Sequence, residues 1–478
     1  MNRRMVCRVL ALIMFCLCAL LIVPTVVALI YGESVRHFLI TIAISAVVGL
    51  VLICFKPEND VIYAKEGFVI VGLGWILMSL FGALPFVISG EIPSYVDALF
   101  ETASGFTTTG ASIMVNVETL SRGCMFWRLF THWIGGMGVL VFIMAVMPMS
   151  GNHSMHIMRA EVPGPTVGKL VPRVRQTAKI LYIIYIAMTF IEMIFLLFGG
   201  MDLYDAVLHA MATAGTGGFS TRASSIAYWN SAYIDTVIAV FMMLFAVNFN
   251  LYYLILIGRI KDALKSEELH WYLAIIAVST LAIAAGISNT YGGVWQGLRY
   301  AFFNVNSLMS SSGFGNTDYT KWPVYCQWIL VLIMFCGASA GSTGGGLKVS
   351  RVMMLVKNAF VDVKRNVRPR SVYRVQIDGK TVSKEVLSAT LSFSLVYFML
   401  LLLFTFVVSF DGHDIATNFT AVLSCLSNMG PGMGLVGPAG NYSIFSDLSK
   451  ITMTLAMLLG RLEIFPLLVL FSPSTWRK

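Results

Sequence analysis

Charged residues are scarce in this chain of 478 residues: only 12% are Asp, Glu, Lys or Arg, whereas 57% are hydrophobic. In a soluble protein of this size about a quarter of the residues are charged, because they cover its surface. Lipid must therefore cover most of this protein. Clustered cysteines are also missing, since the eight are scattered, form no Cys-x-x-Cys pair and mostly lie in apolar stretches. We interpret them as small buried hydrophobic residues rather than as disulfides or zinc ligands.

Constellations of catalytic residues are missing as well. His132, His209 and His413 show no ligand spacing, and His153 and His156 fall on a polar loop where we expect them to be solvated. No set of acids, bases or metal ligands gathers at one end of the apolar stretches, as a membrane-embedded transferase would need. We therefore expect no enzyme. The transferase remains the alternative from another class, and a flux measurement distinguishes it from a transporter.

Long apolar runs are abundant. Runs of about 20 apolar residues recur along the chain, and each is long enough to cross about 30 Å of hydrocarbon. The first run, residues 6–30, is too long for the core of a signal peptide, so we expect it to be retained. Lys and Arg collect in alternate loops, at 159–179, 259–265 and 351–384, which is the positive-inside bias of an inner-membrane protein. The net charge of +9 therefore indicates topology and no nucleic-acid partner.

These runs and loops predict an all-α polytopic membrane protein with an N-terminal helix pair and four repeats. The basic tail at residues 1–8 places the N-terminus in the cytoplasm, and the pair comprises 6–30 and 37–55. Each repeat has an outer helix, a half-helix with an irregular strip, and an inner helix. In that order, the predicted segments are 66–89, 97–110 and 125–147 in the first repeat and 175–198, 205–218 and 233–257 in the second. They are 270–288, 294–313 and 324–356 in the third repeat and 384–410, 414–430 and 448–471 in the fourth. The corresponding boundaries are 1–62 for the pair and 63–160, 161–266, 267–375 and 376–478 for the repeats.

The repeats share one sequence pattern, which is clearest at residues 97–112 and 205–220. A short helix stops and becomes a strip of hydroxyls and glycine, and the spacing from Asp97 to Gly110 equals that from Asp205 to Gly218. Weaker copies lie at 300–315 and 417–432. We expect Asp97, Asp205 and Asp414, near the starts of the half-helices, to be N-caps. The topology places every strip at the outer face and the C-terminus in the cytoplasm.

Such strips suit a cation path. Irregular backbone at membrane depth is tolerated where it is buried in protein or lines a water-filled cavity. Around an axis, carbonyl and hydroxyl oxygens replace the hydration shell of an ion. Glycine permits the unusual backbone angles, and each half-helix points its partially negative C-terminal end at the centre. The alternative is that the glycines only allow tight helix packing.

Four segments carry a family resemblance: 107–110 (Thr-Thr-Thr-Gly), 214–221 (Ala-Gly-Thr-Gly-Gly-Phe-Ser-Thr), 337–348 (Gly-Ala-Ser-Ala-Gly-Ser-Thr-Gly-Gly-Gly-Leu-Lys) and 428–432 (Asn-Met-Gly-Pro-Gly). Together they resemble the Trk/Ktr/HKT superfamily of potassium transporters, and the length and helix pair resemble its bacterial TrkH branch. The resemblance implies four helix–pore-loop–helix units around one pore and a homodimer in the bacterial inner membrane. It also implies a cytosolic nucleotide-binding partner of the TrkA type. K+ would be the transported ion, and the chain would bind no organic cofactor.

The resemblance assigns the selectivity filter to the four strips. Gly110, Gly218, Gly313 and Gly430 would be its glycines, and Met429 and Pro431 depart furthest from the other strips. The potassium-binding residues would be Thr108, Thr109, Gly110 and Ala111; Thr216, Gly217, Gly218 and Phe219; Ser311, Ser312, Gly313 and Phe314; and Asn428, Met429, Gly430 and Pro431.

A gate is expected below the filter. The run 337–346 is similar to a phosphate-binding loop, but Leu347 separates Gly346 from Lys348 and apolar spans flank the run. We expect it to cross the pore, where the family has its gate. The gate residues would be Gly337, Gly341, Ser342, Thr343, Gly344, Gly345, Gly346 and Arg461.

Arg461 lies in the middle of the last span, where a charge costs about 2.5 kcal/mol or more. An ion pair with Glu463 is disfavoured, because residues two apart on a helix point different ways. A pair with Glu192 is the better structural alternative. The resemblance favours a pore-facing arginine that repels potassium near the gate.

The sequence thus predicts potassium uptake through a gated pore. A proton- or sodium-coupled symporter with the same fold is the alternative, although no conspicuous chain of intramembrane carboxylates is visible to relay protons. The basic segment 357–384 is predicted to bind the soluble partner, or else only to set topology.

Overall fold

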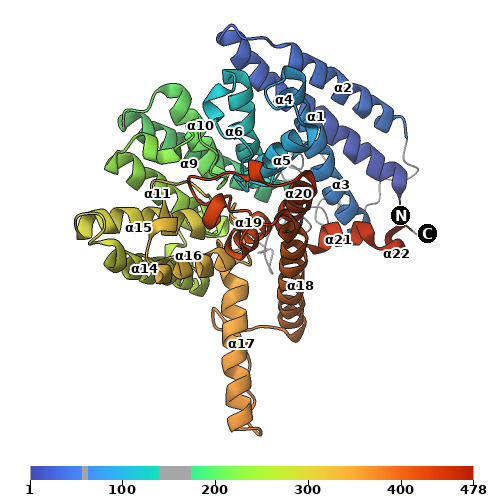
Figure 1. The fold of residues 1–478 in the computed structure, drawn as a ribbon. Helices are drawn as coiled ribbons and strands as arrows, with labels where there is room; N and C mark the ends of the chain where they lie inside the picture. The colour runs from blue at the N-terminus through green and yellow to red at the C-terminus, as the bar shows by residue number, and fades with distance from the viewer. Residues whose placement is uncertain (1, 56–62, 139–173, 477–478) are drawn as a thin grey trace.

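The structure, a computed structural model, describes residues 2–55, 63–138 and 174–476. It is built of helices, and the only strands in these ranges form a hairpin of β1 (Gln376–Ile377) and β2 (Lys380–Thr381). Figure 1 shows the chain passing around a common centre, from blue through green and yellow to red. The N-terminal pair, α1 (Arg3–Ile30) and α2 (Arg36–Ile53), packs along the outside of the first repeat.

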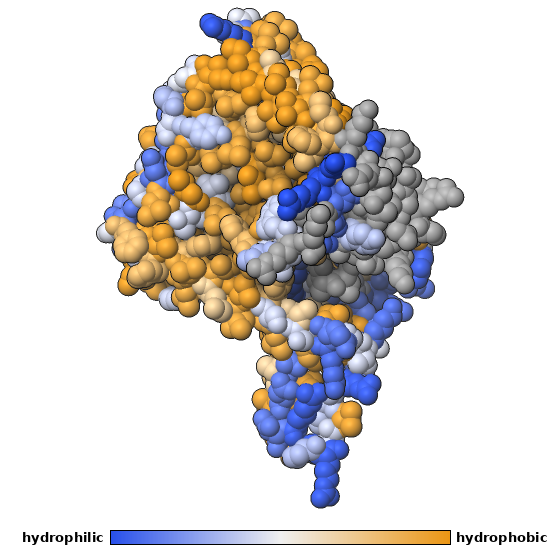
Figure 2. Space-filling model, turned by 90° about the vertical axis from the view of Figure 1, so that its right-hand side faces the viewer, coloured by the Kyte–Doolittle hydropathy of each residue, from blue (hydrophilic) through white to orange (hydrophobic). Residues whose placement is uncertain are grey.

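Among the described residues, six helices are long and apolar enough to cross a membrane, and the bent pair α11 (Ala232–Phe245) and α12 (Phe249–Leu256) makes a seventh if it counts as one span. Their outer faces expose large apolar side chains such as Leu39, Phe190 and Leu402. In Figure 2 a broad hydrophobic surface covers the body, whereas hydrophilic residues cover the arm that projects from it. The chain is therefore an all-α polytopic membrane protein, as predicted.

Each predicted half-helix is a short, mostly buried helix in the structure. These are α5 (Tyr95–Phe106), α10 (Leu203–Ala214), α15 (Val294–Met309) and α19 (Ile415–Ser427). The outer helices are α3 (Ala64–Gly82) with α4 (Leu84–Ser89), α9 (Val174–Phe198), α14 (Glu267–Ile287) and α18 (Lys384–Val408). The inner segments are α6 (Arg122–Met137), α11 with α12, α16 (Val324–Cys336) with α17 (Val349–Val367), and α20 (Asp447–Arg461) with α21 (Phe465–Phe471).

The inner segments are more broken than predicted. The segment 233–257 bends by 89° between α11 and α12, where the Asn248 side chain caps α12 by accepting from the N–H of Asn250. The segment 448–471 is interrupted where Glu463 and Ile464 have left-handed backbone angles. In the first repeat α6 ends at Met137, and the rest of the predicted helix lies outside the described residues. Of these interruptions, the sequence predicts only the one at 337–346, from its long run of glycine and small polar residues.

The prediction of N-caps is correct for one aspartate and wrong for two. Asp414 caps α19 by accepting from the N–H of Thr417 at 3.0 Å, and the hydrogen bond from the Thr417 hydroxyl lowers the pKa of this carboxyl. Ser94 caps α5 instead of Asp97, which forms an ion pair with Lys450 at 2.5 Å. Asp205 lies in the first turn of α10 and pairs with Arg222. Distant cations bind these two carboxylates, and helix-start patterns do not reveal such partners.

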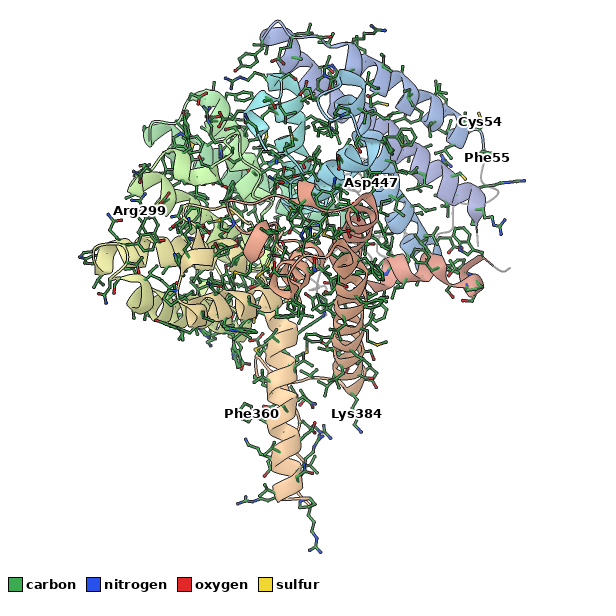
Figure 3. All side chains as sticks on the ribbon, viewed as in Figure 1. Cys54, Phe55, Arg299, Phe360, Lys384 and Asp447 are labelled. Carbon is green, nitrogen blue, oxygen red and sulfur yellow. The ribbon has the colours of Figure 1, made fainter. Side chains whose placement is uncertain are left out.

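The third repeat ends in a projecting arm. Helix α17 extends well beyond the body, with Phe360 on its projecting part (Figure 3). Lys357 pairs with Glu267 of α14 and donates to the carbonyl of Gln376, so the base of the arm is tied to both α14 and the hairpin. Farther out, the side chains of Phe360, Val363 and Val367 are exposed among basic residues.

Candidate ion-conduction site

The four strips have the same backbone conformation. In each strip two residues have left-handed φ angles: a non-glycine residue and, two positions later, the predicted filter glycine. Left-handed angles strain any residue with a Cβ, so their recurrence at the same two places marks one design. The pairs of φ angles are 55° and 78° at Thr108 and Gly110, 55° and 77° at Thr216 and Gly218, 61° and 80° at Ser311 and Gly313, and 54° and 88° at Asn428 and Gly430.

One backbone hydrogen bond holds each strip against its half-helix. The residue before the filter glycine donates its N–H to a carbonyl five residues earlier in the helix. These bonds join Thr109 to Ser104 at 2.8 Å, and Gly217 to Ala212, Ser312 to Ser307 and Met429 to Ser424 at 2.9 Å each. The backbone of the fourth strip therefore has the same conformation as the other three, although its side chains at Met429 and Pro431 are different.

The strips touch one another in a closed ring. A Cβ added to Gly110 would lie closer than 3.0 Å to the carbonyl of Gly217 in the second strip. The same holds for Gly218 against Ser312, for Gly313 against Met429, and for Gly430 against Thr109 of the first strip. Real Cβ atoms essentially never show such separations. Only glycine therefore fits at the four junctions, and the fourth strip closes on the first.

A small cavity opens on the outer side of this ring. Its volume is about 120 Å³, and Gly110, Gly218, Gly313 and Gly430 all line it. Ala111, Phe219 and Pro431 line it as well, whereas Phe314 is buried behind it and accepts at its carbonyl from the Ser307 hydroxyl. The cavity, called the vestibule below, joins the four predicted filter strips at one surface.

Buried polar side chains hold the first two strips together. Arg128 of α6 pairs with Glu101 of α5 at 2.6 Å and donates to the carbonyl of Ser220 at 3.2 Å. The same carboxylate accepts from the Ser112 hydroxyl and the Ile113 N–H, at 2.9 Å each. A buried ion pair of this kind needs all its hydrogen bonds satisfied, so it fixes the positions of the backbone that it touches.

Two histidines have roles that the sequence did not reveal. His132 Nδ1 lies 2.8 Å from the Gly105 carbonyl, and its Nε2 accepts from the N–H of Phe219 at 3.2 Å. A carbonyl only accepts and a backbone N–H only donates, so this ring is neutral with its proton on Nδ1. His209 is held by the carbonyl of Asp205 and by the Ser220 hydroxyl. Both histidines support the second strip, although each stands alone on an apolar helix in the sequence.

The predicted gate loop lies directly beneath the strips. Gly345 donates its N–H to the Ser311 hydroxyl at 2.6 Å, and a Cβ on Gly345 would collide with the Ser427 carbonyl. On its other side the loop fills the bend between α11 and α12. There Ser339 donates to the Ala246 carbonyl at 3.0 Å, and Phe249 donates to the Gly341 carbonyl at 3.1 Å. The bend in the second repeat thus makes room for the loop of the third.

The remaining predicted gate residues, apart from Arg461, lie in the same loop. Gly337 and Gly346 have φ angles of 67° and 81° and lie against one another, so they close the neck of the loop. The Ser342 hydroxyl donates to the Ser339 carbonyl, and the Thr343 hydroxyl donates to the Phe245 carbonyl. Gly344 accepts at its carbonyl from the Lys348 ammonium. The loop is therefore a compact plug of backbone and small side chains.

Arg461 joins the strips to the loop. Its guanidinium donates to the Thr343 carbonyl at 2.7 Å and lies 3.4 Å from the Thr108 hydroxyl. It also donates to the carbonyls of Gly135 and Gly136 at the end of α6. In the part of the chain that the structure describes, no ion pair joins Arg461 to Glu192 or to Glu463, and Glu463 pairs with Arg351 at 2.5 Å. The structural alternative of an Arg461–Glu192 pair is therefore wrong.

The geometry agrees with the comparisons to known proteins. The TrkH family profile, described as a cation transport protein, matches residues 33–478. The chain belongs to the TrkH family. It is 35% identical to the "Trk system potassium uptake protein TrkH" of Escherichia coli K12, over 100% of both chains. It is 34% identical to the "Trk system potassium uptake protein TrkG" of the same strain, over 95% of this chain and 94% of that one.

A solved structure of the TrkH family has the same fold. It is the crystal structure of the potassium transporter TrkH from Vibrio parahaemolyticus, with a TM-score of 0.89 and 30% identity over 100% of both chains. The relatives are named as uptake proteins and transporters. This TrkH-family chain is therefore a multi-pass membrane transport protein and not an enzyme.

The ring contacts predict a change in selectivity when one of the predicted filter glycines acquires a side chain. In Gly110→Ser and in Gly218→Ser, the new Cβ must push away the neighbouring carbonyl, and the left-handed backbone adds about 1–2 kcal/mol of strain. We expect the permeability ratio of potassium over sodium to fall by about tenfold, which corresponds to 1.4 kcal/mol. Reversal potentials in mixed sodium and potassium measure this ratio.

Gly90→Ser is the matched control. Gly90 has a φ of 79°, close to the 78° of Gly110, but an added Cβ meets nothing within 4 Å. The control therefore carries the backbone strain without the ring collision, and its reversal potential should equal that of the unmodified protein. Unchanged reversal potentials in well-folded Gly110→Ser and Gly218→Ser would refute the role of the ring.

Proposed function

We propose that this TrkH-family protein takes up potassium through the ring of four strips. The closed ring is the observation that supports the proposal, because a backbone carbonyl of a neighbouring strip lies at each of its four junctions. Carbonyl oxygens at such a site replace the hydration shell of an alkali cation. The C-terminal ends of α5, α10, α15 and α19 precede the strips and add partial negative charge. The proposed potassium-binding residues are those predicted from the sequence.

The proposed transport runs down the electrochemical gradient. An interior-negative membrane potential supplies about 2.3 kcal/mol per charge per 100 mV, so a gated pore needs no other drive. Potassium flux into proteoliposomes that contain only this protein tests the proposal. We expect flux driven by a potassium gradient alone. Absence of flux would contradict potassium transport, whereas flux that required a proton or sodium gradient would indicate a symporter.

The proposed setting is the bacterial inner membrane, with both termini in the cytoplasm and two copies in a homodimer. Arg3 donates to the Trp476 carbonyl at 3.0 Å, so the two ends of the chain lie together on one side of the membrane (Figure 1). The N-terminal end is basic at Arg3, Arg4 and Arg8, which favours the cytoplasm.

The loop at 337–346 and Arg461 are proposed to form one barrier beneath the filter. The loop closes the path sterically, and the guanidinium adds a positive charge where it contacts the loop and the first strip. Two unit charges about 6 Å apart repel by roughly 3 kcal/mol at an effective dielectric constant of 20. A barrier of this size slows a cation by a factor of order one hundred.

Removal of the barrier should raise the flux. We expect deletion of residues 341–345 to increase potassium flux and to weaken control by a regulatory partner. Arg461→Ala should increase flux by up to about a hundredfold, with less effect on control, whereas Arg461→Lys keeps the charge and should stay near the original flux. Flux per folded protein in proteoliposomes is the measurement. A well-folded Arg461→Ala protein with unchanged flux would refute the barrier role of the arginine.

The arm is proposed to bind a cytosolic nucleotide-binding regulatory partner. Its exposed apolar residues Phe360, Val363 and Val367 lie among basic residues, a combination suited to an interface with an acidic rim. The alternative is that the charges only set topology. Because α17 begins at Val349, directly after the gate loop, a partner on the arm would act close to the barrier.

Neutralising the arm distinguishes these two roles. We expect simultaneous replacement of Lys364, Arg365, Arg368 and Arg370 by Gln to weaken binding of the partner by tenfold or more. Basic charges at the rim of an interface speed association by attracting an acidic partner, so their loss should by itself slow binding. Binding is measured with purified protein in detergent, and topology by accessibility of the termini. Arg259→Gln with Lys261→Gln, in another basic loop, is the control. Full binding by the arm variant with topology preserved would contradict the proposal.

A further inference from the structure

The vestibule has an unexpected charge for the mouth of a cation path. Arg128 and Arg222 both line it, and none of the described residues that line it is an aspartate or a glutamate. The other lining residues are mostly glycine, small or apolar residues, with a few neutral hydroxyls and Asn441. A hydrated cation that enters this cavity therefore meets fixed positive charges before it reaches the carbonyls of the ring.

Each arginine has a carboxylate partner, but both partners are buried away from solvent. Glu101 pairs with Arg128 and has 0% of its side chain exposed, and Asp205 pairs with Arg222 and has 2% exposed. Neither carboxylate lines the cavity. Both ion pairs thus present their positive ends to the vestibule.

Arg222 is the more influential of the two charges. Its side chain is 28% exposed, compared with 3% for Arg128, and its distance to the Asp205 carboxylate is 3.3 Å. Its buried Nε has no hydrogen-bond partner among the described residues, and its guanidinium carbon lies 4.4 Å from the centre of the Tyr228 ring. The Asp205 carboxylate also accepts from the Thr221 hydroxyl, so it is shared. The guanidinium charge is therefore only partly neutralised on its cavity side.

A positive potential at the mouth acts on ions according to their charge. The energy of an ion in a potential is proportional to its valence, so a factor that lowers the local concentration of a monovalent cation is squared for a divalent one. This discrimination acts on the hydrated ion in the vestibule. It precedes and is independent of the size and hydration effects in the ring.

We propose that Arg222 makes the vestibule an electrostatic valence filter that keeps divalent cations from entering and blocking the potassium path. The proposal rests on the proposed function, because it requires a cation path through the ring. It assigns to a residue outside the predicted filter the exclusion of ions such as barium, magnesium and calcium.

The test compares external barium block with potassium affinity in proteoliposomes. Barium is a divalent cation close in size to potassium, so size selection alone excludes it poorly. We expect Arg222→Gln to increase the apparent affinity for external potassium by about threefold and that for blocking barium by about the square of this factor, ninefold. Arg222→Lys keeps the charge and should retain the weak block. Lys321→Gln removes an outer-face charge that is 80% exposed and outside the vestibule, and it should change neither value.

A double variant controls for the buried partner. Arg222→Gln alone leaves Asp205 without its cation, whereas Asp205→Asn with Arg222→Gln removes both charges of the pair. Stronger barium block in the double variant supports the proposal. If barium block is stronger in the single variant but not in the double variant, the effect comes from the Asp205 carboxylate that has lost its cation. That result would overturn the proposal.

A measurement on the unmodified protein needs no substitution. A positive mouth is screened by salt, since the Debye length falls from about 10 Å at 0.1 M to 3 Å at 1 M. Raising ionic strength with an impermeant monovalent salt should therefore strengthen barium block, and weaker or constant block overturns the proposal. If the unmodified protein carries no potassium, the proposed function fails. If it carries potassium but barium block changes neither with the charge at position 222 nor with ionic strength, only the proposal of a valence filter fails.

Discussion

The structure depends on one constraint, the contact of each of the four strip glycines with the carbonyl of the next strip. Because a Cβ at any of the four junctions would overlap a neighbouring backbone, each strip is positioned by the strip before it and positions the one after it. Contacts of backbone against backbone leave little slack, since no flexible side chain lies between them. Four segments that are far apart in sequence therefore behave as one rigid ring. A cation bound there, as proposed, would meet oxygens whose spacing is set by the whole fold.

Side chains that differ between repeats maintain this common backbone. The Arg128–Glu101 pair and His132 tie the first strip to the second, and the Asn428 amide donates to the Thr109 hydroxyl at 3.0 Å, which ties the fourth to the first. Buried polar groups are costly unless their hydrogen bonds are satisfied, and here the bonds run between strips. Their stabilisation is thus available only when the ring is assembled. This explains how Met429 and Pro431 are accommodated without a change in backbone.

Much of this arrangement could be predicted from sequence, because apolar runs, basic loops and the glycine spacing are local signals. The half-helices followed from them, and so did a loop at 337–346 that crosses the proposed path. The position of this loop beneath the strips was implied by the family resemblance. The bend at Ala246–Asn248 did not, since the residues around it are as apolar as in a straight helix and its backbone is satisfied by the loop of another repeat. Asp97, Asp205 and His132 were misread or missed for the same reason. Their partners lie in distant segments, and no sequence pattern records those contacts.

Contacts of the same kind connect the loop at 337–346 to the rest of the protein. At one end the loop is anchored to the strips and to the bend of the second repeat, and at the other it continues through Lys348 into α17. Arg351, in the first turn of α17, pairs with Glu463, two residues after Arg461. A displacement of the arm therefore moves the end of the loop and strains the turn that follows the arginine. Both parts of the proposed barrier are thus connected to α17. A partner that binds the arm could therefore act on the barrier without touching the pore.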